Sequence, residues 1–392
     1  MKYILIVPDG MADYNIEELG NKTALEYAKT PNMDKLAKDG IVGRVHTIPD
    51  GMPPGSDVAA LSIMGYDPSV YYTGRAPLEA ANQGIILKPT DIAFRCNLIN
   101  TDGVNIIDYS GGEIPTSQSR ELIAVLQQEL GDEEFRFYPG VSYRHLMVQA
   151  NGSANVRCTP PHDVMGQEIV PNLPTGDGQD KLREFIFTSY DILKNHPINK
   201  KREQENCRAA NMAWFWGQGV QPRLSNFTKR FDVTGTVISA VDLIRGIARL
   251  AGLKAPEIEG ATGTVNTNWK GKSAAAIDAL KTDDFVMLHI EAPDEAGHQG
   301  SLFDKVKSIE LTDSEIVGPI MEEAARYGDY RMLILPDHYT PIIKRTHVGN
   351  PVPFLLSGVG IKSEEAVLSE NYADSADVVI KNGYELINEL FK

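Results

Sequence analysis

The chain of 392 residues carries a formal net charge of −15 at pH 7, and 42% of its residues are hydrophobic. The acidic balance argues against a nucleic-acid or anionic-membrane partner, because both require a basic protein face. The length suits two domains, and the hydrophobic content is typical of a globular protein with a large core.

The chain starts with MKYILIVPDG, in which one lysine precedes a short apolar run. This run is too short for a signal peptide or a membrane-spanning helix, so we expect a buried first strand with Asp9 directly behind it. The three cysteines of the chain, Cys96, Cys158 and Cys207, are unclustered. Their pattern indicates reduced thiols in a cytoplasmic protein.

The segment DGMPPGSDVAALS, residues 50–62, places Ser56 at the mouth of a helix-like run. Serine is a favoured N-cap residue, and PPG is an ordinary loop ending. The backbone N–H groups of a helix start also favour a phosphoryl group. These residues alone leave both roles of Ser56 open, a structural cap and a nucleophile.

Four short apolar runs predict buried strands of a parallel sheet: YILIVPDG, FVMLHIEAPD, RMLILPDH and VPFLLSG. Helical stretches are expected at Ala24–Asp39, Val241–Ala251, Ser273–Ala279 and Ile309–Tyr327. The alternation predicts an α/β fold with a mainly parallel sheet flanked by helices. Ligands bind beyond the carboxyl ends of such strands, where Asp9, Asp294 and Asp337 fall.

The middle of the chain has a different pattern. Alternating segments, DIAFRCNLI, VNIIDYS and RHLMVQA, occur there with helices expected at Ser119–Leu130 and Lys181–Leu193. This composition predicts an α+β domain inserted into the larger fold. We expect the inserted domain to span residues 77–234, which leaves residues 1–76 and 235–392 for the core domain.

Six residues of metal-ligating type lie near predicted strand ends: Asp9, Asp294, His298, Asp337, His338 and His347. In PDEAGH, Asp294 and His298 are four residues apart and would share one face of a helix. Carboxylates and neutral imidazoles suit Mn²⁺, Zn²⁺ or Co²⁺, and six of them divide naturally into two metal sites. Paired metals clamp a transferring phosphoryl group and activate a hydroxyl, which gives Ser56 a role as nucleophile.

The chain resembles the 2,3-bisphosphoglycerate-independent phosphoglycerate mutases of the shorter, archaeal type, which also occurs in bacteria and lies within the alkaline phosphatase superfamily. The likeness covers essentially the whole chain and is carried by motifs such as PPGSDVAALSIMGYDPSVYYTGRAPLEA, FRCNL, FYPGVSYRHLM, TPPHD, FWGQG, EAPDEAGH and LPDHYTPIIKRTH. It implies that Asp9, Ser56, Asp337 and His338 hold one metal ion, while Asp294, His298 and His347 hold the other.

The resemblance also implies a ping-pong isomerisation of 3-phosphoglycerate to 2-phosphoglycerate, with Ser56 as the residue that becomes phosphorylated. The inserted domain would close over the substrate with Arg75, Arg95, Arg144 and His145, because guanidinium groups suit carboxylate and phosphate. His162 and Asp163, in PPHD, would bind the phosphoryl group or act as acid and base for the migrating hydroxyl proton.

The expected cofactors are two divalent ions, first Mn²⁺, with Zn²⁺, Co²⁺ and Mg²⁺ as alternatives, and no 2,3-bisphosphoglycerate. The expected partner is a small phosphorylated carboxylate, without nucleic acid or membrane, and the chain is expected to be a cytoplasmic monomer or small homo-oligomer. Two alternative activities use the same site, a homoserine kinase-like phosphotransferase and a metal-dependent phosphatase. The remaining histidines, His46, His196 and His289, have no evident partner and are interpreted as structural.

Overall fold

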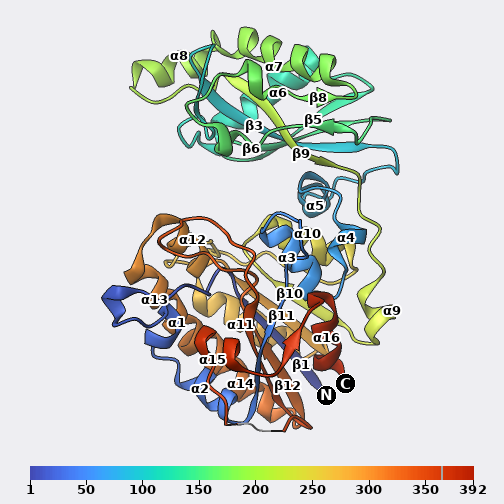
Figure 1. The fold of residues 1–392 in the computed structure, drawn as a ribbon. Coiled ribbons are helices and arrows are strands. Elements are labelled where there is room, and N and C mark those ends of the chain that lie inside the picture. The colour runs from blue at the N-terminus through green and yellow to red at the C-terminus, as the bar shows by residue number, and fades with distance from the viewer. Residues whose placement is uncertain (363–364) are drawn as a thin grey trace. The chain divides into compact units, whose positions relative to one another are not determined.

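The computed structural model describes residues 1–362 and 365–392, which form two compact units. The core unit comprises Met1–Tyr72 and Arg223–Lys392, and the inserted unit comprises Thr73–Pro222 (Figure 1). The second crossing therefore lies earlier than the expected position near residue 234. The reason is α9 (Phe227–Phe231), whose Phe227 ring stacks on Phe285 of the core with a centroid distance of 5.1 Å.

A seven-stranded sheet forms the centre of the core unit. Its order is β10 (Gly235–Ile238), β11 (Phe285–Ile290), β1 (Lys2–Pro8), β12 (Tyr330–Ile334), β13 (Val352–Gly358), β2 (Gly40–Val45) and β14 (Val379–Ile380). The sheet is mainly parallel, but β13 runs antiparallel to both of its neighbours, β12 and β2. The parallel direction expected for VPFLLSG was wrong, because a buried apolar run does not encode strand direction and no crossover helix separates β12 from β13.

Helices cover both faces of this sheet (Figure 1). One face carries α2 (Pro31–Lys38), α11 (Trp269–Leu280), α13 (Leu302–Leu311), α14 (Gly318–Arg326) and α15 (Glu370–Ser375), and their apolar residues share one cluster with those of β1 and β11. On the other face, α3 (Ser56–Ile63) packs against α10 (Asp242–Leu250) and α16 (Gly383–Phe391). Helices α1 (Ala24–Tyr27), α4 (Pro68–Tyr71) and α12 (Ala292–Gln299) complete the unit.

The helix expected over Ala24–Asp39 is interrupted. It forms α1, which ends at Tyr27, and α2, which starts at Pro31 after the non-helical residues 28–30. Proline disfavours a helical conformation in the residue before it, and its own fixed φ suits the first helical position. The stretch expected at Ser273–Ala279 starts earlier instead, at Trp269, because the Asn268 side chain caps it by accepting from Gly271 N–H.

The inserted unit contains a five-stranded sheet in which β4 (Ile106–Asp108), β3 (Ile92–Thr101), β6 (Arg144–Gln149) and β5 (Phe135–Val141) follow one another and β9 (Met212–Gly219) also pairs with β3. These pairings are antiparallel. The other elements are α5 (Ala76–Asn82), α6 (Thr116–Leu130), β7 (Val156–Arg157), β8 (Thr175–Gly176), α7 (Gln179–Leu193) and α8 (Pro197–Gln204). The two units confirm the predicted fold class, a mainly parallel α/β sheet with a smaller α+β domain.

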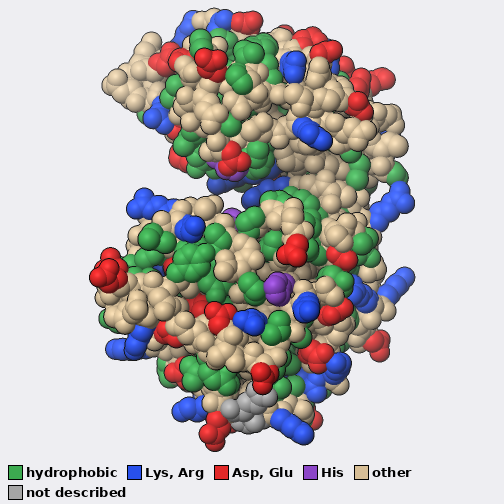
Figure 2. Space-filling model, in the orientation of Figure 1, with side chains coloured by type: hydrophobic (Ala, Val, Ile, Leu, Met, Phe, Trp, Pro, Cys, Tyr) green, Lys and Arg blue, Asp and Glu red, His purple; other side chains and the backbone are tan. Residues whose placement is uncertain are grey.

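Acidic and basic side chains are interspersed on the face of the core unit that Figure 2 shows. Within the described residues, no helix combines the length and the apolar character that a membrane span requires.

Candidate active site

The sheet topology brings the predicted ligands together. Strands β11, β1 and β12 are parallel neighbours, so their carboxyl ends lie at one edge of the sheet. Asp9 follows β1, Asp294 lies in α12 just beyond β11, and Asp337 follows β12. All three carboxylates are buried. The expectation that a shared sheet edge gathers these side chains is confirmed by the geometry.

One candidate metal site consists of Asp294, His298 and His347, whose ligand atoms all lie within 4.8 Å of one another. Asp294 and His298 share one face of α12, and Asp294 Oδ2 lies 3.2 Å from His298 Nε2. His347 comes from the loop before β13, with its Nε2 2.9 Å from His298 Nε2. Two ring nitrogens this close, with the Asp294 carboxylate beside them, suit ligation of one divalent ion.

The second candidate site adjoins the first and contains Asp9, Asp337, His338 and Ser56. His338 Nε2 lies 3.2 Å from Asp337 Oδ2 and 3.5 Å from Asp9 Oδ1. Ser56 Oγ lies 3.2 Å from the same nitrogen. The Ser56 hydroxyl therefore lies beside the cluster formed by Asp9, Asp337 and His338.

Ser56 is the first residue of α3 rather than its N-cap. Gly55 occupies the cap position, and the helix start has no side-chain cap. The helix therefore starts at Ser56, one residue earlier than it would if Ser56 were the N-cap. Its hydroxyl meets His338 rather than the N–H groups of its own helix. The neighbouring Asp57 accepts a hydrogen bond from the Tyr72 hydroxyl at 2.7 Å, which gives this carboxylate a structural role.

The histidine side chains are oriented by contacts of their Nδ1 atoms. His298 Nδ1 lies 3.0 Å from the Arg345 carbonyl oxygen, and His347 Nδ1 lies 3.0 Å from the Pro54 carbonyl oxygen. Carbonyl oxygens only accept, so both Nδ1 atoms carry a proton, and in the neutral form of each ring Nε2 is the atom that offers a lone pair to a metal ion. Partners of this kind orient metal-ligating histidines and fix their tautomer.

Thr340 is a positioning residue that the sequence did not indicate. Its hydroxyl donates to Asp294 Oδ1 at 2.6 Å and lies 3.2 Å from His338 Nδ1. The Thr340 carbonyl accepts from the fully buried Lys305 at 2.7 Å, and Lys305 is paired with Asp13 at 2.9 Å. A buried ion pair therefore holds the loop that connects the two candidate metal sites.

The electrostatics of the cluster fit bound cations. Burial and the nearby carboxylates of Asp337 and Asp294 raise the pKa of Asp9 well above its usual value. Burial alone would lower the pKa of His298, but the Asp294 carboxylate outweighs it and raises this pKa to about 9. In addition, Asp9 Oδ1 and Asp337 Oδ2 are buried without a hydrogen-bond partner. Excess negative charge and unpartnered ligand oxygens are both relieved by divalent ions.

A second cluster lies wholly within the inserted unit and contains two of the predicted substrate-binding residues, Arg75 and Arg95. Glu79 of α5 accepts from Arg75 Nε at 3.0 Å, and its other oxygen lies 3.0 Å from Arg95 Nε. Burial alone would raise the pKa of Glu79, but the guanidinium groups of Arg95 and Arg75 lower it below its usual value. The Arg95 guanidinium lies over the Trp216 ring, 4.3 Å from its centroid.

Strand alternation separates Arg144 from His145. Arg95 pairs with Leu146 and Trp216, and Asn97 pairs with Arg144, so Arg95 and Arg144 share one face of the sheet. His145 belongs to the opposite face, is 1% exposed and accepts from Gly140 N–H at 2.9 Å. Burial lowers its pKa to about 3. The structure thus does not bring His145 together with the arginines, because adjacent strand residues point to opposite faces.

His162 and Asp163 lie in a 3₁₀ turn over Pro161–Val164. His162 Nε2 is 3.7 Å from Asp163 Oδ1, and both side chains are exposed. The His162 ring packs edge-on against Trp216, with 5.1 Å between the centroids. Trp216 therefore connects His162 to Arg95, although its ring is also part of the apolar core of the unit.

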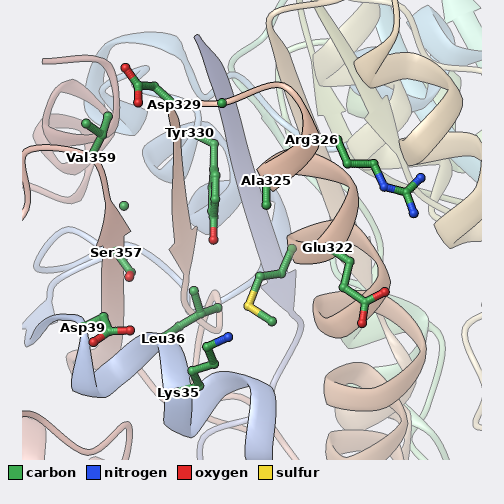
Figure 3. Close-up of a pocket in the computed structure, with 13 residues that line it drawn as sticks. Lys35, Leu36, Asp39, Glu322, Ala325, Arg326, Asp329, Tyr330, Ser357 and Val359 are labelled. Atoms are coloured by element: carbon green, nitrogen blue, oxygen red, sulfur yellow. The ribbon is translucent and has the colours of Figure 1, made fainter.

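A pocket of about 740 Å³ lies elsewhere in the core unit (Figure 3). Its lining includes Lys35 and Leu36 of α2, Asp39 at the C-cap of that helix, and Asp329 and Tyr330 where β12 begins. The candidate ligands Asp337 and His338 follow the opposite, carboxyl end of β12. This pocket is therefore not part of the candidate active site.

Comparisons with known proteins identify one family over most of the chain. A profile of the 2,3-bisphosphoglycerate-independent phosphoglycerate mutase family matches residues 37–199. A probable enzyme of that name from Geobacter sulfurreducens is 49% identical, over 99% of this chain and 98% of the relative. One from Methanosarcina mazei is 51% identical over 91% and 90% of the two chains.

Solved structures agree with these relatives. A protein from Pyrococcus horikoshii has a TM-score of 0.83 and 31% identity, covering 100% of this chain and 98% of its own. The cofactor-independent phosphoglycerate mutase from Thermoplasma acidophilum has a TM-score of 0.66 and 27% identity, over 100% and 99% of the chains. The chain belongs to the archaeal-type 2,3-bisphosphoglycerate-independent phosphoglycerate mutases, a family of isomerases.

Proposed function

We propose that this chain interconverts 3-phosphoglycerate and 2-phosphoglycerate through a phosphoserine at Ser56, without 2,3-bisphosphoglycerate. The observation that carries the proposal is the position of Ser56 Oγ, 3.2 Å from His338 Nε2 at the edge of the Asp and His cluster. A hydroxyl at a helix start beside such a cluster suits nucleophilic attack on a phosphoryl group.

We assign Asp9, Ser56, Asp337 and His338 to one divalent ion and Asp294, His298 and His347 to the other, with Mn²⁺ as the ion expected first. Ions bound there would stabilise the charge that develops on the attacking and leaving oxygens of phosphoryl transfer. The carbonyl oxygens of Arg345 and Pro54 orient the imidazoles of His298 and His347. Thr340 fixes the positions of Asp294 and His338.

In the inserted unit, Arg75, Arg95 and Arg144 are proposed to bind the carboxylate and phosphate of the substrate. Glu79 holds Arg75 and Arg95 in fixed orientations, so little side-chain entropy is lost when the anion binds. His162, with Asp163 beside it, is proposed to hold the proton that moves between the 2- and 3-hydroxyl groups of glycerate.

A coupled assay tests this proposal. Protein loaded with Mn²⁺ is incubated with 3-phosphoglycerate and enolase in the absence of 2,3-bisphosphoglycerate, and formation of phosphoenolpyruvate is followed. We expect steady turnover that stops on chelation and returns with Mn²⁺. Parallel incubations measure phosphate release and, with ATP and homoserine, phosphohomoserine by ³¹P NMR. Turnover only in one of these parallel incubations would overturn the mutase assignment.

A further inference from the structure

His289 is a histidine of the core sheet that lies beside the candidate metal ligands. It belongs to β11, where it pairs with Val7 of β1, and the backbone N–H of Asp9 donates to the carbonyl of the next residue, Ile290. The His289 side chain is 1% exposed, and its Nε2 lies 3.2 Å from Asp9 Oδ2. Two central strands thus hold this imidazole against Asp9.

The contact between His289 and Asp9 is not a hydrogen bond. His289 Nε2 is buried without a hydrogen-bond partner, as are Asp9 Oδ1 and Asp337 Oδ2. One ligand atom from each of these three residues lies within 4.8 Å of the other two. A buried polar atom without a partner is costly, and three such atoms on residues whose ligand atoms cluster this closely fit a cation bound between them.

The Nδ1 atom of His289 lies beside an oxygen atom, as do the Nδ1 atoms of the other histidines in the cluster. Its Nδ1 lies 3.5 Å from Ser239 Oγ, a buried hydroxyl that also accepts from Val241 N–H. His298, His347 and His338 likewise have Nδ1 beside an oxygen and Nε2 turned into the cluster. An outer partner on Nδ1 that leaves Nε2 turned inward is the arrangement of metal-ligating histidines.

We propose that His289 Nε2 is a protein ligand of the divalent ion held by Asp9 and Asp337, so that the centre uses four histidines. This inference rests on the metal-binding part of the proposed function and is independent of the substrate. It assigns a ligand from within a strand, whereas the other ligands all lie beyond the strand ends.

The first test compares His289→Gln with His46→Gln, which removes a histidine of the same unit that lines a separate pocket with Pro49 and Asp50. Mn²⁺ and Co²⁺ binding are measured by calorimetry, together with the visible absorption of bound Co²⁺. We expect His289→Gln to bind one of the two ions about 10- to 100-fold more weakly and to change the Co²⁺ spectrum. His46→Gln should match the wild type.

Wild-type affinity and an unchanged spectrum in a folded His289→Gln protein would overturn the assignment of His289 alone. A wild-type protein that binds no divalent ion would overturn the whole metal centre. The melting temperature of the metal-free variant, compared with that of the metal-free wild type, separates a folding defect from lost ligation.

A second measurement uses the intact wild type and needs no variant. In the proton NMR spectrum of the protein loaded with Co²⁺, each ligating imidazole contributes one strongly shifted, solvent-exchangeable Nδ1–H resonance. The proposal predicts four such resonances. Three resonances, with both ions bound, would contradict it.

Discussion

The Ser56 hydroxyl oxygen lies 3.2 Å from His338 Nε2, although 282 positions separate the two residues in the chain. Helix α3 presents the serine, and the loop after β12 presents the histidine. The candidate nucleophile and the candidate metal centre therefore form one site within the core unit.

Replacing Ser56 with Ala should abolish the mutase reaction while both ions remain bound. Loss of a nucleophile costs about 10³-fold or more in turnover, whereas carboxylates and imidazoles supply most of the metal ligation. Enolase-coupled turnover and calorimetric Mn²⁺ titration measure the two effects. Ser62→Ala, on the same helix, is the matched control and should keep its activity. Near-wild-type turnover by Ser56→Ala would rule out the phosphoserine route.

Metal affinity should fall as the pH is lowered from 9 to 6. The pKa of His298 in the metal-free protein is about 9, so below that pH its ring must lose a proton before Nε2 can ligate. Each pH unit should weaken binding at the Asp294 site by about tenfold. Mn²⁺ titrations across this range measure the slope. A flat profile would contradict the assignment of His298 as a ligand.

Replacing Thr340 with Val should weaken metal binding without changing the ligand set. The hydroxyl that donates to Asp294 and contacts His338 is lost, while the side-chain volume is nearly kept. Loss of such an outer partner lowers metal affinity about 10- to 100-fold. Thr340→Ser keeps the hydroxyl and should restore the affinity in the same calorimetric titration. Equal affinities for the Val and Ser variants would show that Thr340 only fills space.

Replacing Glu79 with Gln should impair substrate binding more than the chemical step. The substitution removes the carboxylate that pairs with the buried Arg95 and with Arg75 Nε. We expect the KM for 3-phosphoglycerate to rise about tenfold, which corresponds to about 1.4 kcal/mol. The free energy of unfolding should fall by about 3 kcal/mol, because one partner of a buried ion pair is removed.

Steady-state kinetics and denaturant unfolding measure the two effects of Glu79→Gln. The control is Glu184→Gln, which removes an exposed ion pair with Lys181 in the same unit. That variant should match the wild type in both measurements. An unchanged KM in Glu79→Gln would show that the arginines do not depend on Glu79 for their orientation.

The sequence was sufficient to predict which strands meet at the site. Asp9, Asp294 and Asp337 follow apolar runs, and parallel neighbours necessarily place their ends at one edge. Strand direction was not predictable in the same way. The run VPFLLSG has the composition of a buried parallel strand but forms the antiparallel β13, because only the length and path of the connection decide direction.

The sequence did not reveal residues whose role depends on contacts with residues far away in the chain. Thr340 and Glu79 act through side chains that only the folded structure brings to them. His289 was interpreted as structural because the sequence offered no evident partner for it. A signal was nevertheless present, since it is the one polar residue in the apolar run FVMLHI. A polar residue buried within a central strand needs a partner, and here the partner is the Asp9 cluster.

The central claim is that Ser56 carries the phosphoryl group during turnover. Enzyme loaded with Mn²⁺ is mixed with [³²P]3-phosphoglycerate, quenched in acid during turnover, digested and mapped by peptide. We predict label on the peptide that contains Ser56, and its loss at the turnover rate after a chase with unlabelled substrate. Formation of 2-phosphoglycerate with no label on that peptide, or with label on another residue, would contradict the account.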